Sequence, residues 1–126
     1  MPHTVTELVA HASSKIENLD VDQAARDLAD GALVVDIREA QEREAAGAIP
    51  GTVHVPRGLL EFNADPAHQL HIADFDPNRR TVLYCASGGR SALAVLALEQ
   101  LGYQNVAHLA GGMQAWISAG RAIATD

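Results

Sequence analysis

The chain contains a single cysteine, Cys85, so no disulfide can form within its 126 residues. Aromatic residues are also scarce: the only ones are Trp116, Tyr84, Tyr103, Phe62 and Phe75. Hydrophobic residues nevertheless make up 48% of the sequence. We therefore expect one globular domain whose core is built mainly from Ala, Val, Leu and Ile.

Basic residues are few: nine Lys and Arg stand against 16 Asp and Glu, which gives a net charge of −7. No basic stripe is present, so binding to nucleic acid is not expected. No apolar run is long enough to cross a membrane, and residues 1–7 lack the basic start and apolar run of a signal peptide. We therefore expect a cytoplasmic protein without membrane contacts, while the sequence leaves its oligomeric state open.

Helical and strand patterns alternate along the chain. Apolar runs predict short strands at residues 32–37, 53–55, 81–84 and 104–109. Helices are predicted at residues 4–17, where Thr6 is the expected cap, and at 22–31, 39–46, 91–100 and 113–119. Residues 57–79 are predicted to form a long connection with one or two helical turns at its start. This alternation indicates an α/β fold with a doubly wound, mostly parallel sheet that has helices on both faces.

Cys85 is the best candidate for a nucleophile because of the sequence around it. It follows the strand predicted at residues 81–84 and opens the run CASGGRS, after which the next helix begins. This places the thiol at the carboxyl edge of the sheet, where ligands bind in open α/β folds. Loop amides and a helix start favour an anion there, so we expect partial thiolate character near neutral pH. A buried structural cysteine is the alternative, but it would not need the glycine loop and the arginine.

Three parts of the sequence together resemble a single-domain rhodanese. They are residues 35–39 with 47–51, residues 85–91, and residues 111–116 with 119–120. The resemblance runs from about Leu19 to about Ala122. It implies a five-stranded parallel sheet in a rhodanese-like domain at residues 19–126, and it leaves residues 1–18 as an N-terminal helical extension of unknown role.

The resemblance also implies a sulfurtransferase that carries sulfur as a persulfide on the catalytic Cys85 and needs no cofactor. The backbone amides of the loop would bind substrate, and the residues concerned are Ala86, Ser87, Gly88, Gly89 and Arg90. The expected partners are a small anionic sulfur donor, thiosulfate or a persulfide, and a thiol or cyanide acceptor, which includes protein thiols. Because Ala86 and Ser87 are neutral, we expect thiosulfate to be a modest donor.

Two other functions stay open. A small phosphatase or arsenate reductase would use the same cysteine, although phosphatase relatives have a loop one residue longer than the loop from Cys85 to Arg90. A non-catalytic interaction module would keep the fold without the chemistry, but the intact cysteine and glycine loop argue against it.

Further polar residues are candidate supporting groups, each with a plainer interpretation beside it. Asp36 and Arg38 either support the site or form an ordinary buried pair. Arg57 either reaches the site or lies on the surface. Arg90 either contacts substrate or turns outward to a carboxylate, and Ser91, which follows the loop, is a further candidate supporting residue.

The remaining candidates are interpreted as structural or surface residues. We interpret Glu42 and Glu44 as a solvated helix face, and Trp116 as a core residue. The histidines do not form a convincing metal framework with Cys85, so we predict no metal site; those considered are His54, His68, His71 and His108.

Overall fold

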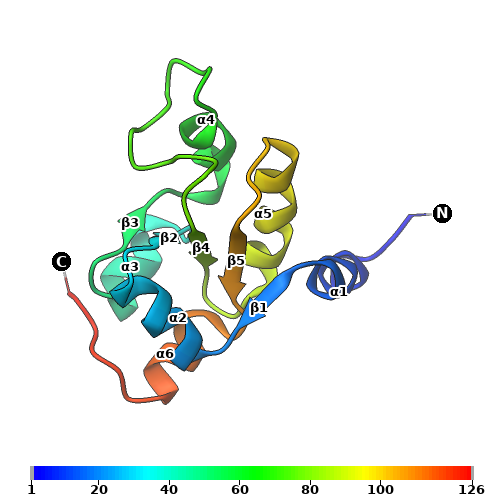
Figure 1. The fold of residues 1–126 in the computed structure, drawn as a ribbon. Coiled ribbons are helices and arrows are strands. Elements are labelled where there is room, and N and C mark those ends of the chain that lie inside the picture. The colour runs from blue at the N-terminus through cyan, green and yellow to red at the C-terminus, as the bar shows by residue number, and fades with distance from the viewer. Residues whose placement is uncertain (1, 126) are drawn as a thin grey trace.

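A five-stranded parallel sheet forms the centre of the protein, as a computed structural model that describes residues 2–125 shows (Figure 1). The strands lie in the order β1-β5-β4-β2-β3, and every neighbouring pair is parallel. Their bounds are Glu17–Leu19 (β1), Leu33–Asp36 (β2), Val53–His54 (β3), Thr81–Tyr84 (β4) and Val106–Leu109 (β5). The predicted α/β class and the five-stranded sheet are confirmed.

Helices connect the strands and cover the sheet. The α-helices are Val5–Lys15 (α1), Val21–Ala29 (α2), Ala40–Ala46 (α3), Leu60–Ala64 (α4), Gly89–Gln100 (α5) and Gly112–Ser118 (α6). A short 3-10 helix, η1, spans Arg57–Leu59. The predicted helices are all present, but α5 begins two residues earlier than expected, because Gly89 is already helical.

The two faces of the sheet carry separate apolar cores. On one face, Val35 and Leu83 belong to a cluster that includes Leu60 of α4 and Leu98 of α5. On the other face, a second cluster joins residues of the strands, α2 and α6; its members include Val34, Val82, Ala24, Met113 and Trp116. Successive strand residues point to opposite faces, so a strand covered on both sides is mostly apolar. Trp116 is buried as predicted, and its indole N–H donates to the carbonyl of Ala122 at 2.9 Å.

Helix α1 begins at a reciprocal cap formed by Thr4 and Glu7. The Thr4 hydroxyl accepts from the Glu7 amide at 3.1 Å, and the Glu7 carboxylate accepts from the Thr4 amide at 2.9 Å. The prediction of Thr6 as the cap was therefore wrong, because only Thr4 has a glutamate at the position that completes this box. The helix packs against α5 and buries Ala12.

Strand β1 was missed in the sequence, and it crosses the predicted boundary between residues 18 and 19. It pairs with β5 at the edge of the sheet, where Leu19 lies opposite Leu109. Arg80 helps to hold it, because its guanidinium donates to both oxygens of Glu17 at 2.8 Å and to Asp27 of α2 at 3.0 Å. This strand has only three residues, of which Leu19 alone is apolar, so it shows no periodic signal and its pairing with β5 determines it.

The long connection after β3 is ordered by its own contacts. Its first part forms η1 and α4, in agreement with the predicted helical turns. Phe75 is buried between them and the rest of the core, and the Nε2 atom of His71 lies 2.9 Å from the Phe75 carbonyl oxygen. The Tyr103 hydroxyl donates to the carbonyl of Ala64 at 2.7 Å, which fixes the end of α4.

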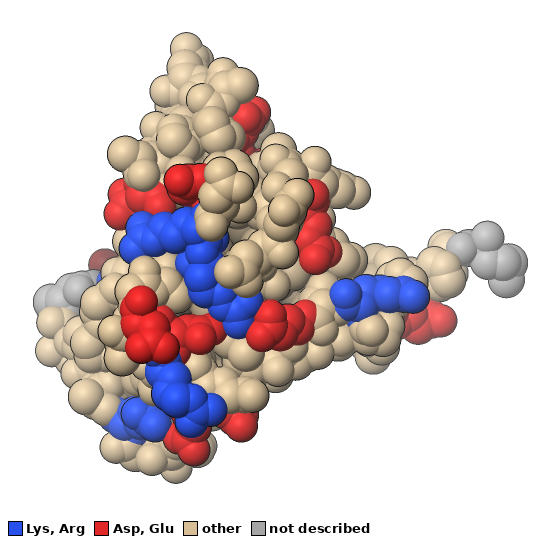
Figure 2. All heavy atoms as spheres, in the orientation of Figure 1, with Lys and Arg blue, Asp and Glu red and all other residues tan. Residues whose placement is uncertain are grey.

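Charged groups of both signs are interspersed on the face shown in Figure 2, where red carboxylate groups adjoin the blue basic groups. Among residues 2–125, none of the helices has the length and apolar character needed to cross a membrane.

Candidate active site

Cys85 comes directly after β4, at the carboxyl end of the strand. Its side chain is only 1% exposed, so the sulfur is enclosed rather than displayed on the surface. The backbone amide of Gly88 donates to the sulfur at 3.1 Å, and the sulfur lies 3.5 Å from the Ser91 hydroxyl oxygen. The loop thus folds back over its own cysteine and directs a hydrogen-bond donor at it.

Gly88 lets the loop make this turn. Its φ of +109° lies in the left-handed region, and a Cβ atom there would run into the carbonyl oxygen of Ala110. Helix α5 starts at the next residue, and its first intrahelical bond runs from Ala92 N to the Gly88 carbonyl at 3.0 Å. The amides of the first helical turn therefore have no helical acceptor of their own, and the positive end of a 12-residue helix adjoins the sulfur.

The start of α6 holds the other side of the loop. The amide of Met113 donates to the Cys85 carbonyl at 2.8 Å, and the amide of Gln114 donates to the Ala86 carbonyl at 3.0 Å. Gly112 makes this approach possible because a Cβ atom there would lie 2.6 Å from both of these carbonyl oxygens. Gly112 therefore supports the cysteine loop.

Arg90 turns toward a carboxylate, which is one of the two orientations left open by the sequence. Its two terminal nitrogens donate to the two oxygens of Glu42 in α3, each at 2.9 Å. The hydrogen bonds from Arg90 lower the pKa of Glu42, and the same bonds raise the pKa of Arg90. The interpretation of Glu42 as a solvated residue was wrong, since it links α3 to the loop, whereas Glu44 is exposed as predicted.

Asp36 and Arg38 form a buried ion pair at the carboxyl end of β2. The Asp36 carboxylate accepts from Arg38 at 2.9 and 3.0 Å, from Arg43 at 2.9 Å and from the Tyr84 hydroxyl at 3.0 Å. Burial acts to raise the pKa of Asp36, but the bonds and charge of Arg38 outweigh it and hold this pKa below its usual range. Arg38 also donates to the Gly47 carbonyl at 2.7 Å, so the pair fixes the turn after α3.

Arg57 is engaged on its own helical segment. Its guanidinium pairs with Glu61 one turn along, at 2.6 Å, and both side chains are partly exposed. Arg57 is therefore held in a partly exposed ion pair.

Ser91 belongs to a buried polar chain that the sequence did not reveal. Its hydroxyl oxygen lies 2.8 Å from His108 Nδ1, and His108 Nε2 lies 2.8 Å from the side-chain oxygen of Asn18. Ser91 is fully buried and His108 is 2% exposed, and burial lowers the pKa of His108 to about 4. The sequence does show a polar residue, His108, inside the apolar strand at 106–109, but it does not show the partners of His108, which are far away in the chain.

The histidines considered as ligands have other partners. His54 Nε2 lies 2.7 Å from the Arg38 carbonyl oxygen, and His68 Nδ1 accepts from the Leu70 amide at 3.1 Å. Within residues 2–125, no three His, Cys, Asp or Glu side chains are grouped so that they could hold a metal ion.

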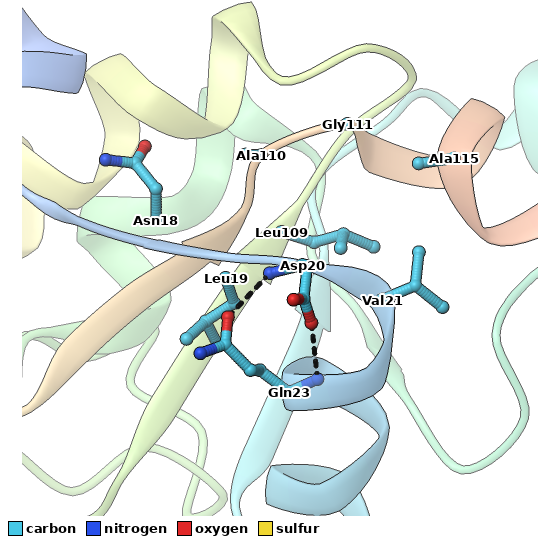
Figure 3. Close-up of a pocket in the computed structure, with 9 residues that line it drawn as sticks. All are labelled: Asn18, Leu19, Asp20, Val21, Gln23, Leu109, Ala110, Gly111 and Ala115. Atoms are coloured by element: carbon cyan, nitrogen blue, oxygen red, sulfur yellow. Dashed lines mark hydrogen bonds between the residues drawn. The ribbon is translucent and has the colours of Figure 1, made fainter.

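Three cavities adjoin this edge of the sheet. One, of about 270 Å³, lies beside Ala86, and Glu42, Met113 and Ile117 are among its lining residues. Another, of about 400 Å³, lies between α1 and Ser87, Gly89 and Arg90 of the loop. The third, of about 500 Å³, lies where β1 and β5 end; in Figure 3 its polar groups Asp20 and Gln23 bond to each other as the cap of α2.

Comparisons with known proteins identify the family. Residues 20–119 match the family described as "Rhodanese-like domain". The chain is 34% identical over 103 residues to a sulfurtransferase of Allochromatium vinosum, covering 80% of this chain and 88% of the relative. It is 34% identical over 105 residues to the thiosulfate sulfurtransferase of Pseudomonas entomophila, covering 83% and 88%.

A solved structure extends the likeness to nearly the whole chain. A Rhodopseudomonas palustris protein of unknown function, called a possible tyrosine phosphatase, superposes with a TM-score of 0.88. It is 38% identical, and the match covers 98% of both chains. The chain therefore belongs to the rhodanese-like domain family.

Proposed function

We propose that the protein is a sulfurtransferase that carries sulfane sulfur as a persulfide on Cys85. The observation that carries the proposal is the position of this sulfur, which accepts an N–H bond from Gly88 at the start of α5. Donors fixed in this way stabilise negative charge without reorganising during the reaction. The similarity to two proteins named as sulfurtransferases supports the same conclusion.

The reaction uses two transfers at one sulfur atom. The Cys85 thiolate attacks the outer sulfur of thiosulfate or of a persulfide, and the bond between the donor's two sulfurs breaks. Its electron pair leaves with sulfite or with the donor's thiolate, and a Cys85 persulfide remains. A thiol or cyanide, or the thiol of a protein, then takes the outer sulfur and restores the thiolate.

The electrostatics of the loop favour a donor other than thiosulfate as the best substrate. The charge of Arg90 is balanced by Glu42, and Ala86 and Ser87 are neutral. The doubly charged thiosulfate would therefore depend mainly on backbone amides, in a protein of net charge −7. A persulfide donor of lower charge is repelled less by the negative charge of the protein.

A phosphatase or arsenate reductase is the second candidate, and the name of the similar Rhodopseudomonas palustris protein favours it. Four residues separate Cys85 from Arg90, which is the shorter spacing associated with sulfur in this family. Arg90 is also committed to Glu42 instead of being free to bind phosphate. A non-catalytic module would need none of the hydrogen bonds that converge on the sulfur.

Substitution of the nucleophile tests the proposal. Cys85→Ser is expected to abolish sulfur transfer from thiosulfate or glutathione persulfide to cyanide, with an unchanged unfolding temperature. Transfer at the wild-type rate in this variant would overturn the proposal. Hydrolysis of an aryl phosphate by the wild-type protein, lost in Cys85→Ser, would establish the second candidate instead.

A further inference from the structure

The chain of contacts from the buried residues Cys85, Ser91 and His108 to the exposed Asn18 has a defined direction of hydrogen bonding. The side-chain amide nitrogen of Asn18 donates to the backbone carbonyls of Ser13 and Ile16, at 2.9 and 3.1 Å. Its side-chain oxygen must then face His108, and an amide oxygen can only accept. His108 Nε2 therefore carries a hydrogen, and Nδ1 of the neutral ring is an acceptor.

Because His108 Nδ1 is an acceptor, the single hydroxyl hydrogen of Ser91 is used in the bond to it. It points at His108 Nδ1, 2.8 Å away, which is the shortest of the contacts made by this oxygen. The lone pairs of Ser91 are left for the Cys85 S–H, at 3.5 Å. A thiolate in the same place would face these lone pairs, so ionisation of Cys85 requires the hydrogens along the chain to move.

The arginines next to the site offer little free charge to a thiolate. Arg90 is paired with both oxygens of Glu42, and Arg38 is paired with Asp36. The thiolate and the persulfide are both anions in an enclosed position. A cation formed within the buried chain would offset this charge.

We propose that Ser91 passes the Cys85 proton to His108, so that the nucleophile forms as a thiolate balanced by an imidazolium. The S–H bond breaks and its proton bonds to Ser91 Oγ, while the original Ser91 hydroxyl proton bonds to His108 Nδ1. Ser91 then donates to the thiolate, and both ring N–H groups donate, to Ser91 Oγ and to Asn18. No proton leaves the site, and sulfur uptake and release proceed with the imidazolium in place.

The groups that meet His108 suit this role. Ser91 from α5 and Asn18 from β1 are uncharged, and Arg90, the neighbour of Ser91, has its charge balanced by Glu42. Burial keeps the ring neutral while Cys85 retains its proton, because it lowers the pKa of His108 to about 4. A thiolate at the other end of the chain favours the charged ring. His108 and Asn18 are thus positioning residues, which act on the sulfur through Ser91.

A titration of the thiolate's ultraviolet absorbance tests the proposal directly, because Cys85 is the only cysteine and the method needs no access to the buried sulfur. Cys85→Ser is the blank, and His11→Gln, at an exposed position on α1, is the matched control. At a fixed pH near neutral, His108→Gln and Ser91→Ala are each expected to lower the thiolate fraction about tenfold. His11→Gln is expected to leave it unchanged.

Asn18→Asp should change the thiolate fraction in the opposite direction, since a carboxylate beside His108 Nε2 favours the imidazolium. This variant is expected to raise the thiolate fraction. It also loses the two bonds that the Asn18 side chain donates to Ser13 and Ile16, so Asn18→Ala, which loses them without adding charge, is its matched control. Asn18 is exposed, which keeps the pair informative even if His108→Gln does not fold. An equal or larger thiolate fraction in folded His108→Gln would overturn the relay, as would a fraction in Asn18→Asp that is no larger than in Asn18→Ala. The titration needs no sulfur donor, so failure of the proposed function, which is seen as failure to form a persulfide, is a separate result.

Discussion

Arg90 and Glu42 lie 48 residues apart in the sequence and are joined by two parallel hydrogen bonds of 2.9 Å. The pair connects the cysteine loop to α3 and balances the charge of Arg90 beside the loop. It therefore affects both the position of the loop and the attraction of the site for anions.

Removal of the Glu42 charge should improve the use of anionic donors. In Glu42→Gln, Arg90 is released, so we expect the KM for thiosulfate to fall about threefold with little change in kcat. Stability should fall by less than about 1 kcal/mol because both side chains are partly exposed. Steady-state kinetics check this, with Glu44→Gln as a control on the same helix. A rise in KM would show that Glu42 helps to form the binding site.

Gly112→Ala should damage the loop support. The new Cβ would meet the carbonyls of Cys85 and Ala86 at 2.6 Å, in a residue whose φ is +61°. We expect a loss of about 3 kcal/mol or more in the free energy of unfolding, together with slower sulfur uptake.

Gly120→Ala is the matched control for that substitution. Gly120 also has a positive φ, +75°, but no atom lies within 4 Å of the added Cβ. The free energy of unfolding of Gly120→Ala should fall by only about 1 kcal/mol, which is the cost of a left-handed backbone for alanine, and the variant should keep its activity. Equal losses in the two urea titrations would argue against the contact of Gly112 with the loop.

Local sequence patterns and contacts between distant residues differ in how well they could be predicted. The cysteine loop, most strands and most helices follow local patterns, and these were found. Contacts between distant residues were missed, since neither Glu42 beside Arg90 nor Asn18 beside His108 has a local signal. Strand β1 was missed for the same reason, because β5 and Arg80 hold it from 63 residues or more away.

Acid should destabilise the protein through His108. Its folded pKa of about 4 lies below the ordinary 6.5, so the unfolded chain takes up the proton first as the pH falls. This contribution is complete above about pH 6.5 and is lost as the pH falls toward about 4, with a limit near 3 kcal/mol. Urea titrations at several pH values check it. The dependence of the free energy of unfolding on pH in this range should become weaker in His108→Gln and stay the same in His11→Gln.

The buried Asp36 carboxylate should be essential for stability. Asp36→Asn leaves Arg38 buried without its counter-charge, so we expect the free energy of unfolding to fall by about 3 to 5 kcal/mol. Glu61→Gln, which breaks the partly exposed pair with Arg57, should cost less than about 1 kcal/mol. Denaturant unfolding of both variants measures the difference. A small loss in Asp36→Asn would mean that water reaches the pair.

The most direct measurement for the account is intact mass spectrometry of the reduced protein after incubation with thiosulfate or glutathione persulfide, followed by cyanide. We predict the gain of one sulfur atom by the wild-type chain, its removal by cyanide, and no gain in Cys85→Ser. A wild-type mass that stays unchanged with both donors would contradict the account.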